Sequence, residues 1–178
     1  MRAGPAAAGK GGHMLSAALQ GERLRLRDFL PSDRDAYLAA RRGAAFGRHA
    51  QPEQRTEAFS AGLLARFLEQ QRQTPRWDWQ LAVVRAVDGA LIGSVGLRGA
   101  AGGEAEFGIE LDEAVWRRGY AAEAAALMLA FGRERLGCRR FHARCVPGNV
   151  AMLALAMRLG FEMQPLRDGG RLELLLVA

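Results

Sequence analysis

The segment from Trp116 to Ala121 places two arginines and a glycine where a helix is expected to begin. Residues 104–111 before it alternate polar and apolar side chains, as a half-buried strand does, and residues 121–136 after it are rich in good helix formers. A short turn between a strand and a helix leaves backbone N–H groups unpaired, and the helix dipole adds partial positive charge. With Arg117 and Arg118, this pattern predicts an anion site whose expected ligand is a phosphate or pyrophosphate.

Two carboxylates lie on the expected strand before this turn. Glu106 and Glu110 are four residues apart, so both side chains project from the same face of a strand. A carboxylate can accept a proton, directly or through water, and it attracts a cationic substrate. We expect the two to be close enough for one to raise the pKa of the other. The alternative is that both are ordinary solvent-facing residues; His142 is a further base candidate, better explained as a strand histidine with satisfied hydrogen bonds.

The elements that position these groups follow from hydropathy periodicity and turn residues. Strands are predicted at 23–27, 79–87, 90–97, 104–111, 139–146, 161–163 and 172–177. Helices are predicted at 32–42, from 56 onward, at 121–136 and at 149–159. The glycine-rich residues 98–103 are predicted to connect two strands, and Asp88-Gly89 is a favoured hairpin turn. Because strands and helices do not alternate regularly, this order predicts a mixed α/β sheet rather than a purely parallel one.

Several residues mark the expected ends of the helices. Ser32, with Asp35 three residues on, is typical of a helix N-cap. Asn149 can cap the last helix, and Gly160 marks its end. Residues 43–55 are expected to form a loop.

Composition limits the classes of function. The chain has 178 residues, enough for one domain with a substantial core, and it carries a formal charge of +6 with a pI near 10.5. Lys10 is the only lysine, and no basic stripe interleaved with aromatic residues is present, so nucleic-acid binding is disfavoured. The charge suits a phosphate-bearing cofactor or an acidic partner. No apolar run is long enough to span a membrane, and we expect no membrane association.

The two cysteines bear on metal binding and location, and the composition of the first residues bears on where the folded domain begins. Cys138 and Cys145 match no zinc spacing, so we expect reduced, buried thiols, no metal and a cytoplasmic location. Residues 1–18 are rich in Ala and Gly without periodicity and are predicted to be a disordered leader or tag-like segment. Residues 19–178 are predicted to form a single domain.

Four segments in this order resemble the GNAT superfamily of acyl-CoA N-acyltransferases, most of all the branch that includes ribosomal-protein N-terminal acetyltransferases. They are its opening strand (22–27), its fourth strand (105–109), its pyrophosphate loop with the following helix (116–124) and its late helix ending in Gly-Phe (149–161). The resemblance covers roughly residues 19–177. It implies a central, mostly antiparallel twisted sheet, flanked by helices and splayed between its fourth and fifth strands.

The resemblance also implies acetyl-CoA as co-substrate, lying in the splay, and no metal. The pantetheine arm would pair with the free edge at Ile109, Glu110 and Leu111, and Asn149 would bond the cofactor from the other side. Gly119 would be the position where backbone most closely approaches phosphate. The loop residues expected to meet the pyrophosphate are Trp116, Arg117, Arg118, Gly119, Tyr120 and Ala121.

The implied reaction is direct attack of a neutral primary amine, from a protein N-terminus or a small molecule, on the thioester. Glu106 or Glu110 would accept the amine proton, and a backbone N–H near Leu111 would hold the oxyanion. Many relatives place a tyrosine acid near the late helix; this chain has only Tyr37 and Tyr120, which do not fit.

The branch also commonly has a serine three residues after the asparagine, where this chain has Met152. These departures leave open an alternative, a non-catalytic acyl-CoA-binding module with a regulatory or structural role. Relatives often form dimers, so the resemblance leaves a homodimer open.

Overall fold

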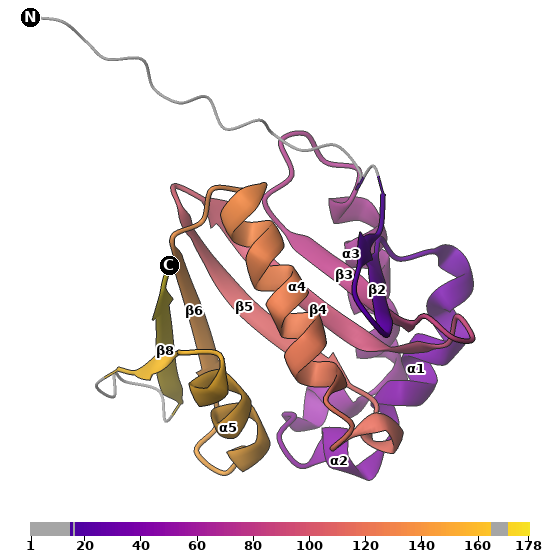
Figure 1. Ribbon diagram of the computed structural model, residues 1–178. Helices are drawn as coiled ribbons and strands as arrows, with labels where there is room; N and C mark the ends of the chain where they lie inside the picture. Colours follow the sequence, from indigo (N-terminus) through magenta and orange to yellow (C-terminus); the bar gives the residue numbers. More distant parts are fainter. Residues whose placement is uncertain (1–14, 16, 165–170) are drawn as a thin grey trace, which may run out of the picture.

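The computed structural model describes residue 15, residues 17–164 and residues 171–178, and over these ranges it forms one sheet flanked by helices (Figure 1). The strand order is β1-β2-β3-β4-β5-β6-β8-β7. Neighbouring strands are antiparallel except β5 and β6, which are parallel. This architecture confirms the predicted mixed, mostly antiparallel sheet.

The strands are β1 (Leu19–Gln20), β2 (Leu24–Arg27), β3 (Trp79–Arg85), β4 (Leu91–Ala101), β5 (Glu104–Leu111), β6 (Arg140–Cys145), β7 (Glu162–Met163) and β8 (Leu172–Val177). The α-helices are α1 (Arg34–Arg41), α2 (Ala44–Gly47), α3 (Glu57–Gln70), α4 (Tyr120–Glu134) and α5 (Val150–Arg158). Short 3₁₀ helices are η1 (Pro31–Asp33), η2 (Pro52–Arg55) and η3 (Glu113–Val115).

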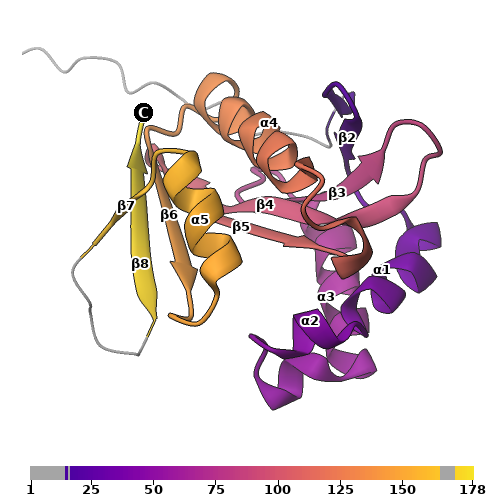
Figure 2. The same cartoon turned by 60° about the horizontal axis from the view of Figure 1, so that its bottom comes forward.

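Helices cover both faces of the sheet, which makes three layers. Helices α4 and α5 lie on one face, and α1 and α3 lie on the other (Figure 2). Side chains alternate along β3, so Leu81 and Val83 join the core beneath α4, while Ala82 and Val84 join the core beneath α1 and α3. Both cores are apolar, and this burial holds the helices on the sheet.

Most element predictions are confirmed, with corrections at the ends. Strand β1 precedes the first predicted strand, so the fourth and fifth predicted strands are β5 and β6. Residues 98–103 are not simply a connection, because β4 continues through Ala101 and leaves only a tight turn. The predicted loop at 43–55 contains α2 and η2. The predicted leader lies mostly, and the Asp168-Gly169-Gly170 turn lies wholly, outside the described residues.

The predicted N-cap of α1 at Ser32 is wrong. Ser32 does not cap α1, because Pro31 begins a 3₁₀ turn ahead of that helix. Asp33 occupies the N-cap position of α1 without a side-chain cap hydrogen bond, and its Oδ2 accepts a hydrogen bond of 2.8 Å from the backbone N–H of Leu30 at the start of η1. The cap at Asn149 is confirmed, since its Oδ1 accepts from the N–H of Met152 at 3.1 Å.

Cys138 and Cys145 are both buried and unbonded, as predicted. Across the described ranges, no group of three His, Cys, Asp or Glu side chains could hold a metal ion. No helix there is both long and apolar enough to cross a bilayer.

Candidate functional site

The sheet opens between β5 and β6, as predicted. Their pairing comprises only Glu104 with Arg140, Ala105 with Phe141, and Glu106 with His142. Beyond Glu106, β5 continues to Leu111 along β4 alone. The second half of β5 therefore has one strand neighbour, and its other edge faces the opening.

Backbone direction on this edge follows from one hydrogen bond. The N–H of Asp112 donates to the carbonyl of Ile92, towards β4, at 2.9 Å. Backbone groups alternate in direction along an antiparallel strand, so the polar groups of Ile109 and Leu111 point towards the opening. The indole Nε1 of Trp116 donates to the carbonyl of Leu111 at 2.9 Å. Trp116, which departs from the usual loop residue, therefore fastens the loop to the end of β5.

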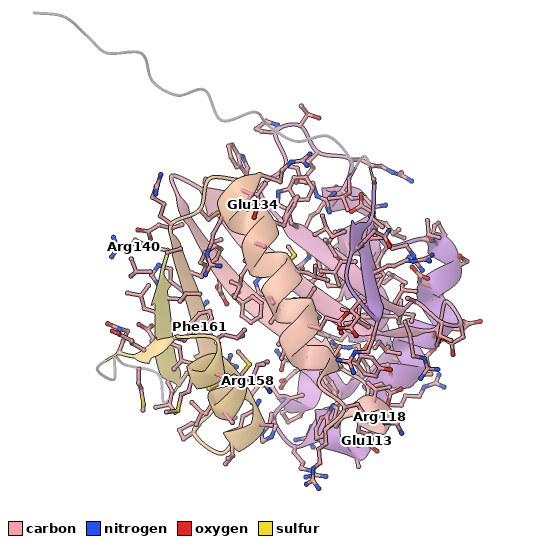
Figure 3. All side chains as sticks on the ribbon, in the orientation of Figure 1. Glu113, Arg118, Glu134, Arg140, Arg158 and Phe161 are labelled. Carbon is pink, nitrogen blue, oxygen red and sulfur yellow. The ribbon has the colours of Figure 1, made fainter. Side chains whose placement is uncertain are left out.

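The turn before α4 is exposed, and its backbone N–H groups are free to donate hydrogen bonds. Arg117 has φ of 61° and Gly119 has φ of 81°, so both adopt left-handed backbone conformations. Within the described residues, no backbone N–H from Arg117 to Ala122 donates to another protein group. Figure 3 marks Arg118 at the start of α4 and Glu134 at its far end. Successive free amides at a helix start, beside two arginines, form a concave anion-binding turn.

Arg23 holds this turn in place, a role that the sequence did not reveal. Its Nη1 donates to the carbonyl of Arg118 at 2.8 Å, and its Nε pairs with Glu123 on α4 at 3.0 Å. The guanidinium also lies 4.8 Å from the ring centre of Tyr120. Glu123 in turn accepts from the backbone N–H groups of Arg23 and Leu24. Strand β2 and the turn are thus tied together through both main chain and side chain.

Glu110 lies at the open end of β5 against α1. Both its carboxylate oxygens accept from Nη1 of Arg41, at 2.7 and 2.5 Å. The Arg41 side chain is 6% exposed and that of Glu110 is 33% exposed. Burial raises the pKa of the Glu110 carboxyl, and the ion pair with Arg41 offsets this shift only in part. Such a carboxylate is a better proton acceptor than an ordinary surface glutamate.

Glu106 has a different environment on the same face of the strand. Its two oxygens pair with Arg98 at 2.8 Å and Arg144 at 2.7 Å. Burial raises the pKa of Glu106, but these hydrogen bonds outweigh it and leave the pKa below its usual value. The expected coupling to Glu110 is wrong, because four strand residues span about 13 Å. The raised pKa of Glu110 comes from burial and not from a second carboxylate.

The structure also shows the positions and partners of His142, Tyr37 and Asn149. His142 pairs with Glu104 at 3.1 Å, which agrees with a satisfied strand histidine. Tyr37 is buried on α1, its hydroxyl lies 3.4 Å from Nη1 of Arg41, and burial raises its pKa far above the usual range. Asn149 lies at the start of α5, next to the end of β6. Its amide nitrogen remains available because only its oxygen serves the cap.

Comparisons with known proteins concern the family and the fold of the chain. The model of the acetyltransferase (GNAT) domain matches residues 23–162. The uncharacterized N-acetyltransferase YoaA of Bacillus subtilis is 27% identical over 151 residues, which are 82% of this chain and 83% of YoaA.

Two solved structures share the fold. The ribosomal-protein acetyltransferase RimL, solved with coenzyme A, has a TM-score of 0.75 at 16% identity, over 90% of this chain and 98% of RimL. A Vibrio cholerae protein described as a ribosomal-protein-serine acetyltransferase has a TM-score of 0.72 at 18% identity, over 93% of this chain and 99% of its own. Because the domain match spans most of the sequence and the fold agrees, the chain belongs to the acetyltransferase (GNAT) family.

Proposed function

We propose that this acetyltransferase moves an acetyl group from acetyl-CoA to a primary amine, by direct attack of the amine on the thioester. The observation that carries the proposal is the free row of amides from Arg117 to Ala122, next to the unpaired edge of β5. One feature binds a diphosphate and the other binds an extended amide-containing arm. Coenzyme A carries both groups in one molecule.

The residues present fit that molecule. The amides of residues 117–121 supply the diphosphate site, and Arg117 and Arg118 add charge at its exposed mouth. The main-chain N–H and carbonyl of Ile109 and the N–H of Leu111 would meet the pantetheine arm, with Asn149 on the other side of the opening, while the carbonyl of Leu111 accepts from Trp116. The bound thioester supplies the activated acetyl group. A backbone N–H at Leu111 would stabilise negative charge that develops on its oxygen.

Glu110 is the base that we favour. It lies at the end of the same strand edge that would hold the thioester, whereas Glu106 lies where β5 and β6 are still paired. A neutral amine is needed for attack, and amines are mostly protonated at neutral pH. Glu110, directly or through water, would accept the proton, and the ion pair with Arg41 keeps its carboxylate oriented.

No side-chain acid is assigned to the leaving thiolate. The two tyrosines of the chain lie on α1 and α4 rather than on α5, and Met152 occupies the first turn of α5. We infer that water protonates the thiolate. We expect no steep loss of turnover above neutral pH that follows a side-chain pKa, and a pH profile with such a loss would contradict this inference.

The test is release of free CoA from acetyl-CoA in the presence of a mixed panel of amines. Peptides with free N-termini, polyamines and aminoglycosides cover the acceptor classes. We expect turnover with at least one of them and none when the amine is blocked by acetylation. Tight CoA binding without turnover on any amine would instead favour the non-catalytic binding module.

Replacing Arg23 by alanine should weaken CoA binding about 10-fold, since the turn loses the hydrogen bond to the carbonyl of Arg118 and the support of Glu123. Titration calorimetry with CoA measures the effect. Arg25→Ala on the same strand is the matched control, because its side chain is exposed and makes no hydrogen bond or ion pair in the described structure. Equal affinities of the two variants would show that Arg23 does not position the turn.

A further inference from the structure

A basic hollow lies on the sheet face that carries α1, next to the Glu110–Arg41 pair. Its volume is about 520 Å³, within the range of ligand sites. The end of α1, α2 and η2 line it. The lining residues are Arg41, Arg42, Gly43, Ala44, Phe46, Gly47, Arg48 and Arg55, so half of them are arginines and none is acidic.

Two of the four arginines already have carboxylate partners. Arg41 pairs with Glu110, and its guanidinium also lies 4.1 Å from the ring centre of Phe46. Arg42 pairs with Glu57 at 2.6 Å. These two positive charges are therefore neutralised within the protein.

The other two arginines keep their charge. Arg55 donates only to the carbonyl of Ala50, at 3.1 Å, and Arg48 is exposed. Neither makes an ion pair with a carboxylate of the described chain. Glu113 lies against Gly43, where an added Cβ would be 3.3 Å from its Cδ. The hollow thus retains net positive charge on its outer side.

Groups of opposite charge lie at different places in this region. Glu110, which pairs with the lining residue Arg41, would accept the proton of the amine beside the hollow, while the exposed Arg48 and Arg55 attract anions. Arg48 follows α2 and Arg55 ends η2, so the hollow offers two separate cationic groups, which suits a chain with more than one carboxylate better than a single small carboxylate. An amine delivered to Glu110 would place the residues that follow it in the hollow.

We propose that the acceptor is the N-terminal amine of an acidic peptide segment, with carboxylates in the residues just after the first. This inference rests on the proposed acetyl transfer and names its acceptor class. Arg48 and Arg55 determine the specificity, by pairing with those carboxylates.

The experiment compares three peptides with the same N-terminal serine, followed by three Asp, three Gln or three Lys residues. We expect kcat/KM for the acidic peptide to exceed that for the neutral peptide about 10-fold at low salt, the size expected of two exposed ion pairs. The ratio should fall towards one in 1 M salt, where the screening length is about 3 Å. Fluorescence anisotropy of labelled acidic peptide, with CoA present, gives an independent affinity.

The double variant Arg48→Glu and Arg55→Glu should reverse the order, so that the lysine peptide becomes the better acceptor. The matched control is Arg66→Glu with Arg72→Glu, which makes the same charge change at exposed positions outside the hollow. The control should keep the acidic preference.

The outcomes separate the two proposals. Turnover that ignores peptide charge, or a control that loses the preference as fully as the test variant, would overturn the acidic-acceptor assignment and leave acetyl transfer standing. Equal efficiency on free aspartate would overturn the peptide part of it. No turnover on any amine despite CoA binding would overturn the proposed function, and this inference with it.

Discussion

Replacing Gly119 by valine should weaken CoA binding at least about 100-fold while the fold stays intact. Gly119 has φ of 81°, a conformation that a β-branched residue strongly disfavours, and the added Cβ would lie 3.2 Å from Nη2 of Arg23. The turn must therefore change, and the amides no longer converge on one anion. Hydrogen bonds to a charged group contribute about 1.5–3 kcal/mol each, so losing two accounts for this factor.

Gly137→Val is the matched control for this prediction. Gly137 has φ of 71°, and a Cβ there would have no atom within 4 Å. It lies between α4 and β6, away from the turn, so it carries similar backbone strain without touching the site. Calorimetry with CoA should show weak binding for the first variant and normal binding for the second, with both folded by circular dichroism. Normal affinity in the Gly119 variant would refute the assignment of the turn.

Replacing Glu110 by glutamine should lower kcat about 10²- to 10⁴-fold, the usual contribution of a general base. The amide keeps the shape of the side chain but cannot take the amine proton. CoA affinity should stay near normal, because the diphosphate turn is a separate element. The change also removes the charge partner of the buried Arg41, so activity should be measured well below the melting temperature of the variant.

Glu106→Gln is the control, with the same substitution on the same strand face. We expect it to keep most of the turnover, because Glu106 is held by two arginines where the sheet is still closed. If both variants keep full turnover at neutral pH, neither residue is the base. If only the Glu106 variant fails, the roles are reversed.

The pH dependence of kcat gives a second test of Glu110. The carboxylate is the active form, so activity should fall as the pH drops through its pKa. Burial raises that pKa, so this acid limb should lie above the range of an ordinary glutamate. It should disappear in Glu110→Gln. For Glu106 the ion pairs lower the pKa, so a limb below the ordinary range would point to that residue instead.

Local pattern was enough to predict the strand, the helix and the helix cap that border the candidate site. Alternation over Glu104–Leu111 matched β5 residue for residue, and the helix formers after Gly119 matched α4 within two residues. The cap at Asn149 is formed by atoms within three positions of one another. Such features depend on residues that are neighbours along the chain, so they can be predicted from the sequence. Short elements such as β1 and α2 have too few residues for a periodic signal and escaped prediction.

Pairing between distant segments did not follow from pattern. Arg23 reaches Arg118 across 95 positions, and Arg41 reaches Glu110 across 69. Both glutamates had seemed equivalent because they share a strand face. Helix α1 packs its arginine against one of them, while β4 and β6 bring arginines to the other.

The sequence by itself determined the element types, the turn at Gly119 and the family resemblance, because each arises from residues that are near one another along the chain. Tertiary structure alone decided which arginines pair with each carboxylate, in which direction each carboxyl pKa shifts, where the sheet opens and which arginines keep their charge. These properties depend on desolvation and on strand register, and both are set only when α1 and the strands pack together.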